Sequence, residues 1–365
     1  MLGKLLDRFR QKGPSRPRSK AQSEKMRRLL IVLLIVLAVV SSVSVVGYGY
    51  YDTNIKPWHQ RIVKVNGTVI EMRSFVKMLR LYGGASNPST SLAQQAATSM
   101  EENELMRQGL EDQFRVDIGG VTSDEAVEAF LRPIFVSNGQ LSDNATEDEY
   151  QQVYQESLAG WEKTYGVSAK DFLDLAIRPS LVQKELQKQI GDRDYPVDGL
   201  VKHAQVEALL IQGSENATAV RDQWMGAADQ DAEFELLAAD NATYKPVKKY
   251  LKTNADNTTV VWVAKGVEST AFDDYTFSEN ITPGVISQTI LDSDSSGSYW
   301  VTKVLAIEWT PLSETDRSTL ISKAFTKWLE DAKNPENNDI VYYLSKKGGQ
   351  AKLTWAVDHA TVSTG

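Results

Sequence analysis

Few residues of this 365-residue chain have side chains suited to catalysis. The sequence contains no cysteine and only three histidines, His59, His203 and His359. The absence of cysteine excludes disulfides, thiolate zinc sites, iron–sulfur clusters and cysteine nucleophiles. Three histidines so far apart in the sequence are not the pattern of a histidine-rich metal site either. We expect His203 and His359 to be solvated surface residues.

One loop partly resembles a metal site. Asp292-Ser-Asp-Ser-Ser-Gly297 matches the first six positions of an EF-hand calcium loop, but Lys303 stands where the bidentate glutamate is needed. The chain has no Gly-x-Ser-x-Gly elbow, no His-Glu-x-x-His and no Gly-x4-Gly-Lys loop. The sequence therefore predicts no metal and no cofactor, and the loop is interpreted as a hairpin turn.

The first 51 residues join a basic segment to a long apolar run. Residues 1–28 hold ten lysines and arginines against two acidic residues, although the whole chain has a net charge of −8. Residues 29–51 carry no charge, and about 20 apolar residues span a bilayer. A buried core helix or a cleaved signal peptide would have a shorter apolar run. The basic flank therefore predicts a single-pass cell-membrane protein with a cytoplasmic N-terminus and extracytoplasmic C-terminal domains.

Residues 60–197 show mostly helical spacing. A short extended segment with an Asn66-Gly67 hairpin turn comes first. Thr122-Ser-Asp-Glu125 and Thr146-Glu-Asp-Glu149 resemble capping boxes, and Pro179 is expected to kink a helix or to start its second half. We predict an all-α domain here.

The pattern changes at residue 198. Strand-length apolar runs at 206–211, 260–263 and 299–305 alternate with short helical stretches. They predict an α+β domain with a small antiparallel sheet over residues 198–309. Residues 312–357 are expected to form a C-terminal helix and strand that pack back on the helical domain.

The order of several weak motifs resembles that of the SurA/PrsA-type extracytoplasmic foldases, a mainly bacterial family. The motifs are Val65-Asn-Gly67 before a helix with Phe75, Phe234 ahead of Leu237-Ala238, and Pro283-Gly-Val-Ile-Ser287 leading into Gly297-Ser-Tyr-Trp300. The resemblance covers about residues 63–355. It implies a SurA N-terminal-like chaperone domain over 60–197 and a divergent parvulin/PpiC-type prolyl isomerase domain over 198–309.

The two histidine positions that this resemblance assigns to an active parvulin hold other residues here. Ala208 stands on the first strand and Trp300 on the last. Neither side chain surrounds a twisted amide with the polar groups that isomerisation needs. The resemblance leaves an apolar peptide-binding set with no confident catalytic residue, and the alternative is that these residues are simply core: Phe272, Leu210, Phe234, Phe277 and Trp300.

Three functions remain open. The leading hypothesis is a membrane-anchored chaperone that holds unfolded or secreted polypeptides in a groove between its two domains, with isomerase activity lost. The second is an active prolyl isomerase, and the third is a structural accessory subunit of a membrane or envelope complex. The expected partners are polypeptide clients, the lipid bilayer through residues 29–51 and a membrane-complex partner, but no nucleic acid.

Overall fold

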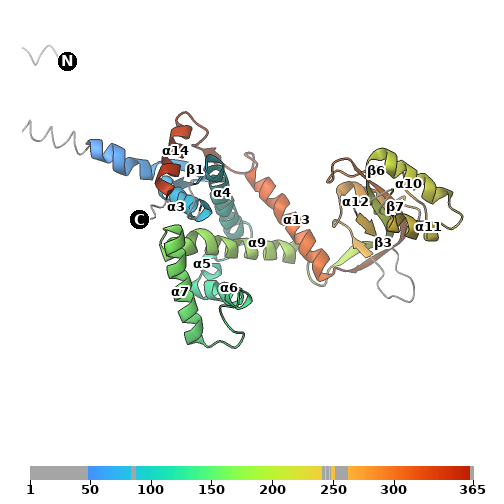
Figure 1. The fold of residues 1–365 in the computed structure, drawn as a ribbon, viewed down its shortest axis with the longest axis horizontal. Coiled ribbons are helices and arrows are strands. Elements are labelled where there is room, and N and C mark those ends of the chain that lie inside the picture. The colour runs from blue at the N-terminus through green and yellow to red at the C-terminus, as the bar shows by residue number, and fades with distance from the viewer. Residues whose placement is uncertain are drawn as a thin grey trace, which may run out of the picture.

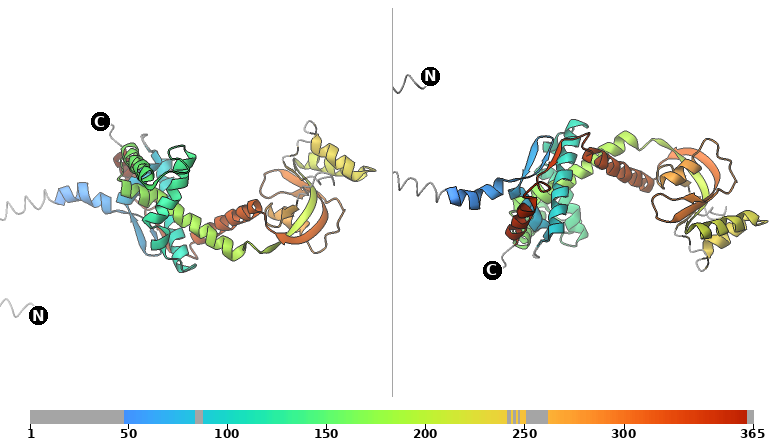
Figure 2. Two further views of the ribbon diagram at one scale, coloured as in Figure 1. Left: turned by 90° about the horizontal axis from the view of Figure 1, so that it is seen from below. Right: turned by 90° about the horizontal axis from the view of Figure 1, so that it is seen from above.

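The computed structural model describes residues 48–83, 88–240, 243, 246, 248–250 and 262–361. These residues form two bodies set apart along the long axis of the molecule, here called the helical body and the sheet body (Figure 1). The other views show the same separation, with α9 and α13 running between the bodies (Figure 2).

The helical body is built from the first half of the described chain and from the C-terminal segments. Its elements, in chain order, are η2 (Tyr51–Ile55), η3 (Lys56–His59), β1 (Arg61–Val65), β2 (Thr68–Glu71), α3 (Met72–Gly83), α4 (Thr90–Asp112), α5 (Ile118–Val121), α6 (Asp124–Ser137), α7 (Glu147–Tyr165), α8 (Ala169–Phe172), η4 (Leu173–Ile177), α9 (Arg178–Asp194), β8 (Ile340–Tyr342) and α14 (Gly349–Ala360).

Local signals explain where several of these helices begin. The predicted capping box at the start of α7 is confirmed, because the Thr146 side chain accepts from the backbone of Glu149 and the Glu149 side chain accepts from that of Thr146. At α6 the cap is Ser123, one residue later than the Thr122 box predicts. Pro179 lies in the first turn of α9, where its missing N–H costs nothing.

The prediction of an all-α domain is wrong, because the helical body contains a three-stranded antiparallel sheet of order β2-β1-β8. The predicted Asn66-Gly67 hairpin joins β1 to β2, and Asn66 takes the left-handed conformation that this turn requires. The third strand comes from the far end of the chain, with Val63 opposite Tyr342. Tyr342 also donates to the carboxylate of Glu101, and burial raises the pKa of Glu101.

The sheet body is a five-stranded antiparallel sheet with helices on its faces. Its path is β4-β3-β7-β6, and β5 also pairs with β3. The long strands β3 and β7 pair along their whole length, from Leu200 opposite Pro311 to Gln212 opposite Ser298. The elements are β3 (Leu200–Gln212), α10 (Ser214–Gly226), α11 (Gln230–Ala239), β4 (Lys248–Tyr250), β5 (Trp262–Ala264), α12 (Thr270–Thr276), β6 (Ile290–Leu291) and β7 (Ser298–Pro311).

Helix α13 (Glu314–Lys333) joins the two bodies. At its first half, Leu320 is 2% exposed and packs against the turn at Gly266 of the sheet body. In its second half, Trp328 packs against Gly109 of α4, and the Trp328 indole donates to Gln113. One continuous helix therefore contacts both bodies.

The predicted cell-membrane location is contradicted. Across the part of the chain that the structure describes, no helix has both the length and the apolar character to cross a bilayer. The predicted basic tail, residues 1–28, and residues 29–47 of the predicted span lie outside the described residues. The last residues of that span are the exposed Tyr48, Tyr50 and Tyr51, directly before an exposed Asp52–Lys56 ion pair.

Candidate functional site

The positions that the family resemblance assigns to histidine lie close together on one face of the sheet body. Ala208 is opposite Thr302, and Trp300 is opposite Leu210, so Ala208 and Trp300 are diagonal neighbours on adjacent strands. Both are buried, at 0% and 1% exposure. A catalytic site at these positions would have to be open to solvent, but both side chains are buried.

The indole of Trp300 fills this position. Its ring centroid lies 4.8 Å from that of Phe272 and 6.3 Å from that of Tyr250, and the Tyr250 ring is stacked on it. Trp300 Nε1 donates to Asp292, which is itself 5% exposed, over 3.2 Å. The group is therefore a packed aromatic core with its one indole donor satisfied.

The polar groups beside this core are bound to one another. The Tyr250 hydroxyl donates to Glu268, and the Lys248 ammonium forms an ion pair with the same carboxylate. Burial raises the pKa of Tyr250, and the Glu268 carboxylate raises it further, so the phenol stays protonated. With Asp292 bound to Trp300, these groups already have partners within the fold.

The five residues of the predicted peptide-binding set are all buried, and the structure brings four of them together. Leu210, Phe272, Phe277 and Trp300 belong to one apolar cluster. Phe234 belongs to a different cluster, where its ring stacks on Trp224 with centroids 4.5 Å apart. The exposed fractions of the five range from 0% to 6%, so none of them offers surface to a client.

The histidines do not assemble into a site. The prediction that His203 is solvated is wrong, because it lies within β3 at 3% exposure with its Nδ1 2.8 Å from the Thr310 hydroxyl. His359 is exposed and stacks on Trp355, with centroids 3.8 Å apart. Within the described ranges, no three His, Asp or Glu side chains are arranged to hold a metal ion.

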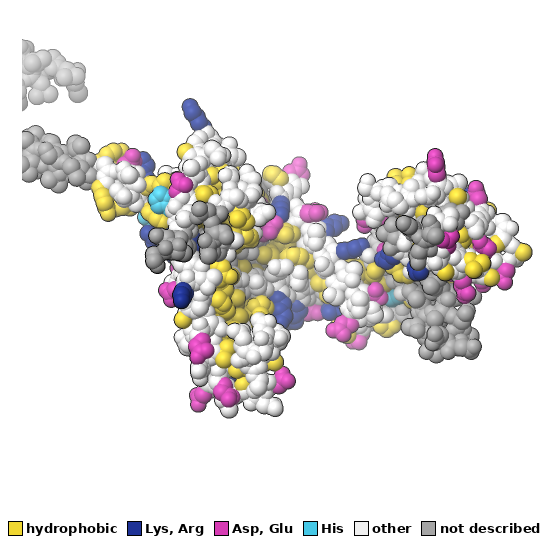
Figure 3. All heavy atoms as spheres, viewed as in Figure 1, with side chains coloured by type: hydrophobic (Ala, Val, Ile, Leu, Met, Phe, Trp, Pro, Cys, Tyr) yellow, Lys and Arg dark blue, Asp and Glu magenta, His cyan; other side chains and the backbone are white. Residues whose placement is uncertain are grey.

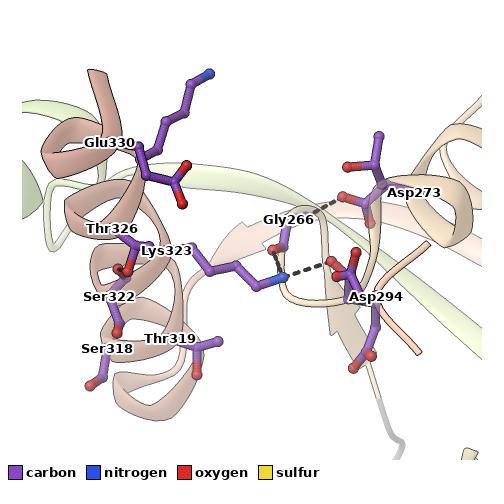
Figure 4. Close-up of a pocket in the computed structure, with 12 residues that line it drawn as sticks. Gly266, Asp273, Asp294, Ser318, Thr319, Ser322, Lys323, Thr326 and Glu330 are labelled. Atoms are coloured by element: carbon purple, nitrogen blue, oxygen red, sulfur yellow. Dashed lines mark hydrogen bonds between the residues drawn. The ribbon is translucent and has the colours of Figure 1, made fainter. Parts of the chain in front are cut away.

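A hollow of about 700 Å³ lies where α13 meets the sheet body (Figure 4). The Lys323 ammonium donates to the carbonyl oxygens of Gly266, Val267 and Glu268, over 2.7–3.0 Å. Four hydroxyl side chains of α13 line the rest of one wall, namely Ser318, Thr319, Ser322 and Thr326. This hollow has both polar and apolar lining, and it lies between α13 and the sheet body, with no residue of the helical body in its wall.

Asp273 lies in the wall of this hollow and has an unusual environment. Its Oδ2 accepts from the backbone N–H of Gly266 over 2.7 Å, whereas its buried Oδ1 has no partner among the described residues. Burial raises the pKa of Asp273 to about 6, partly opposed by Lys323. Because burial disfavours the charged form of this carboxyl group, the folded protein is more stable when Asp273 is protonated than when it is ionised.

Stability should therefore fall with rising pH because of Asp273. A raised folded-state pKa contributes stability that is fully present below about pH 4 and is lost as the pH rises through about 6. Asp273→Asn, which mimics the neutral acid, should be more stable than the unchanged chain at pH 7.5 by about 1–3 kcal/mol and equal to it at pH 4. Urea unfolding at both pH values measures this, with the exposed neighbour Asp274→Asn as control. If the free energy of unfolding changed with pH equally in the unchanged chain and in Asp273→Asn, the raised pKa of Asp273 would be contradicted.

The helical body has two further hollows that together form what we call the helical groove. One, of about 610 Å³, lies among α3, α4, α7 and α9, and the other, of about 590 Å³, lies among β2, α3, α4, α5 and α9. Asn103, Leu175 and Pro179 line both, so the two hollows adjoin along one wall. Figure 3 shows hydrophobic side chains on the viewed face of the helical body, next to α7.

Aliphatic, methionine and aromatic side chains together form the apolar walls of the groove. Met78 and Met106 line the first hollow and Met100 lines the second. At the mouth of the first hollow, Phe172 stacks on Trp161 and on Tyr165, with centroids 4.2 and 5.7 Å apart. The three methionines are 4–8% exposed, so the apolar surface open to a client comes from partly exposed side chains such as Leu81, Phe172 and Leu175.

The local backbone explains why the groove stays open. Between α8 and α9 the helix widens into the π-helical turn η4, and Pro179 follows in the first turn of α9. Such turns offset the residues that follow and are frequent at functional sites. Sequence reasoning missed this groove, and its only signal in the sequence was Pro179, because its walls come from eight separate elements: β2, α3, α4, α5, α7, α8, η4 and α9.

The comparisons with known proteins agree with the family resemblance. No protein-family model and no curated protein matches the chain. Among solved structures it is similar to the peptidylprolyl isomerase PrsA of Bacillus anthracis (12% identity, TM-score 0.33, 73% of this chain and 99% of that one) and of Bacillus cereus (14%, 0.32, 84% and 94%). It is also similar to a structure of the SurA-like chaperones PEB4 and Cj1289 of Campylobacter jejuni (14%, 0.24, 59% and 90%). These solved structures bear the names of the family that the sequence motifs resemble.

Proposed function

We propose that this protein is a chaperone that holds unfolded or extended polypeptides in the helical groove. The observation that carries the proposal is the pair of adjoining hollows, whose partly exposed apolar lining includes Leu81, Phe172 and Leu175. Each hollow has room for several side chains, and burying one large apolar side chain contributes about 1.5–3 kcal/mol. A client would be held by such burial and by backbone contacts, without chemistry.

The experiment that tests the proposal blocks the groove at its shared wall. Asn103 lines both hollows and is half-buried on α4. Asn103→Trp should fill this wall and weaken suppression of client aggregation about tenfold or more, equivalent to losing one buried side chain. The matched control is Gln95→Trp on the exposed face of the same helix, which should hold clients as the unchanged chain does.

Two outcomes would overturn the holding function. One is full aggregation in the presence of the unchanged protein, and the other is equal protection by Asn103→Trp and by the unchanged chain. Stoichiometric recovery of one partner without any holding activity would instead favour the accessory-subunit alternative.

We also propose that prolyl isomerase activity has been lost. Rotation about an X–Pro amide has a barrier of about 18–20 kcal/mol, which an enzyme lowers by placing polar groups around the twisted bond. At the corresponding positions this chain has the methyl group of Ala208 and the buried indole of Trp300. Adding the protein should leave the cis/trans relaxation rate of an X–Pro peptide at its uncatalysed value. Acceleration that survives further purification would favour the active-isomerase alternative.

A further inference from the structure

A small hollow on the helical body is lined by three cations and by no acidic residue. It has a volume of about 370 Å³ and lies between η3 and α3. Arg73, Lys77 and Arg80 fall at four- and seven-residue intervals from Arg73 and therefore share one face of α3. Trp58 of η3 and Val76 complete the wall. We call it the cationic hollow.

Most of the positive charge in this hollow is not neutralised. Arg80 donates to two uncharged carbonyl oxygens, those of Gly166 (2.9 Å) and His359 (3.0 Å). Arg73 is exposed and makes no hydrogen bond or ion pair with the residues that the structure describes. Only Lys77 has an acidic partner, Asp171, at 2.7 Å. Two guanidinium charges therefore face a hollow that contains no carboxylate.

Each cation has a distinct role toward an anion. Arg73 is free to turn its planar guanidinium toward a carboxylate and to bind both oxygens at once. The Nε of Arg80 is buried without a partner among the described residues, and Nη1 and Nη2 each donate to a carbonyl, so Arg80 is fixed in place and adds its charge to the hollow. Trp58 gives the apolar wall, and its position is fixed by an edge-to-face contact with Trp355.

The cationic hollow adjoins the helical groove. Arg73 lines both the 590 Å³ hollow of the groove and the cationic hollow. The nearby acid Glu71 lines the 590 Å³ hollow and not the cationic hollow, and its carboxylate lies 3.3 Å from Nδ1 of His59. A polypeptide lying in the groove can therefore bring an acidic group to Arg73 while its apolar residues stay buried.

We propose that the cationic hollow binds a carboxylate of the polypeptide held in the groove, from an Asp or Glu side chain or from the chain terminus. The ligand is thus an apolar segment with one acidic group at its edge. This inference rests on the proposed holding function, because the groove supplies the rest of the contact. The cationic hollow would make the holding site prefer segments with an acidic group, a preference that apolar burial alone cannot produce.

The test compares two labelled apolar peptides that differ only by Glu or Gln at one end, binding to the full chain at low salt. The Glu peptide should bind about tenfold more tightly, the size of one charge-assisted hydrogen bond, and the difference should shrink at high salt. Arg73→Gln should reduce the preference to about twofold without loss of folding, since Arg73 is exposed and supports no other described residue. Lys184→Gln, which removes an exposed charge of α9 outside both hollows, should leave it unchanged.

The outcomes separate the two proposals. If both peptides bind equally to the unchanged chain, the carboxylate site is refuted and the holding function stands. If the preference persists in Arg73→Gln, the carboxylate binds elsewhere and the inference is refuted as well. If neither peptide binds, the holding function itself fails.

Discussion

Replacing Trp300 by alanine is expected to lower the free energy of unfolding of the sheet body by about 3–5 kcal/mol. The indole is 1% exposed and packs against Phe272, so its loss leaves a cavity that the two long strands cannot close. The substitution also removes the donor to the buried Asp292, which places the expected loss at the upper end of this range, because an unsatisfied buried acceptor costs about 1–3 kcal/mol. Urea unfolding followed by circular dichroism measures the change.

The control for this prediction is the exposed tryptophan of the same strand. Trp309 is 61% exposed, and Trp309→Ala should change stability by about 0.5 kcal/mol or less. A loss below about 1 kcal/mol for Trp300→Ala would mean that the indole is not packed in a filled core. The proposal that this position cannot serve as an isomerase pocket would then fail.

Gly109→Ala is expected to destabilise the attachment of α13 to the helical body. A Cβ at Gly109 would lie 2.2 Å from Cζ2 of Trp328, and this indole is held in place by its hydrogen bond to Gln113. The gain of about 1 kcal/mol from alanine in a helix is therefore outweighed by the displacement of Trp328, and we expect a net loss of about 1–3 kcal/mol. Thermal unfolding and the fluorescence of Trp328 report the change.

The matched control is Gly160→Ala in the middle of α7. Nothing lies within 4 Å of a Cβ at Gly160, so only the backbone effect remains. That variant should gain about 0.5–1 kcal/mol. A loss of stability in Gly109→Ala together with a gain in Gly160→Ala would show that α4 needs Gly109 for close packing against Trp328. Equal gains of stability in both variants would contradict this contact.

The parts of the fold that the sequence predicts are those with local causes. The Asn66-Gly67 hairpin, the Thr146 cap of α7 and the restart at Pro179 follow from backbone conformation and short-range hydrogen bonds. These interactions involve residues within about four positions of each other. They are therefore readable without knowledge of the tertiary structure.

The rest depends on contacts between distant segments. The sequence predicts a strand within residues 312–357 but not its partner: β8 has only three residues, and it pairs with the edge of β1, where Val63 lies opposite Tyr342. His203 looks like a surface residue in sequence, but the pairing of β3 with both β5 and β7 buries it. The helical groove is likewise invisible in sequence, since its walls meet only after α3, α4 and α9 pack.

The most direct test of the account is the methionine methyl NMR spectrum of the full chain during addition of an unfolded client. The groove has Met78, Met100 and Met106 in its walls, whereas Met225 is 46% exposed on α10 of the sheet body. A client held in the groove should shift or broaden the signals of Met78, Met100 and Met106 and leave that of Met225 unchanged. Perturbation of Met225 with no change at the three groove methionines would contradict it.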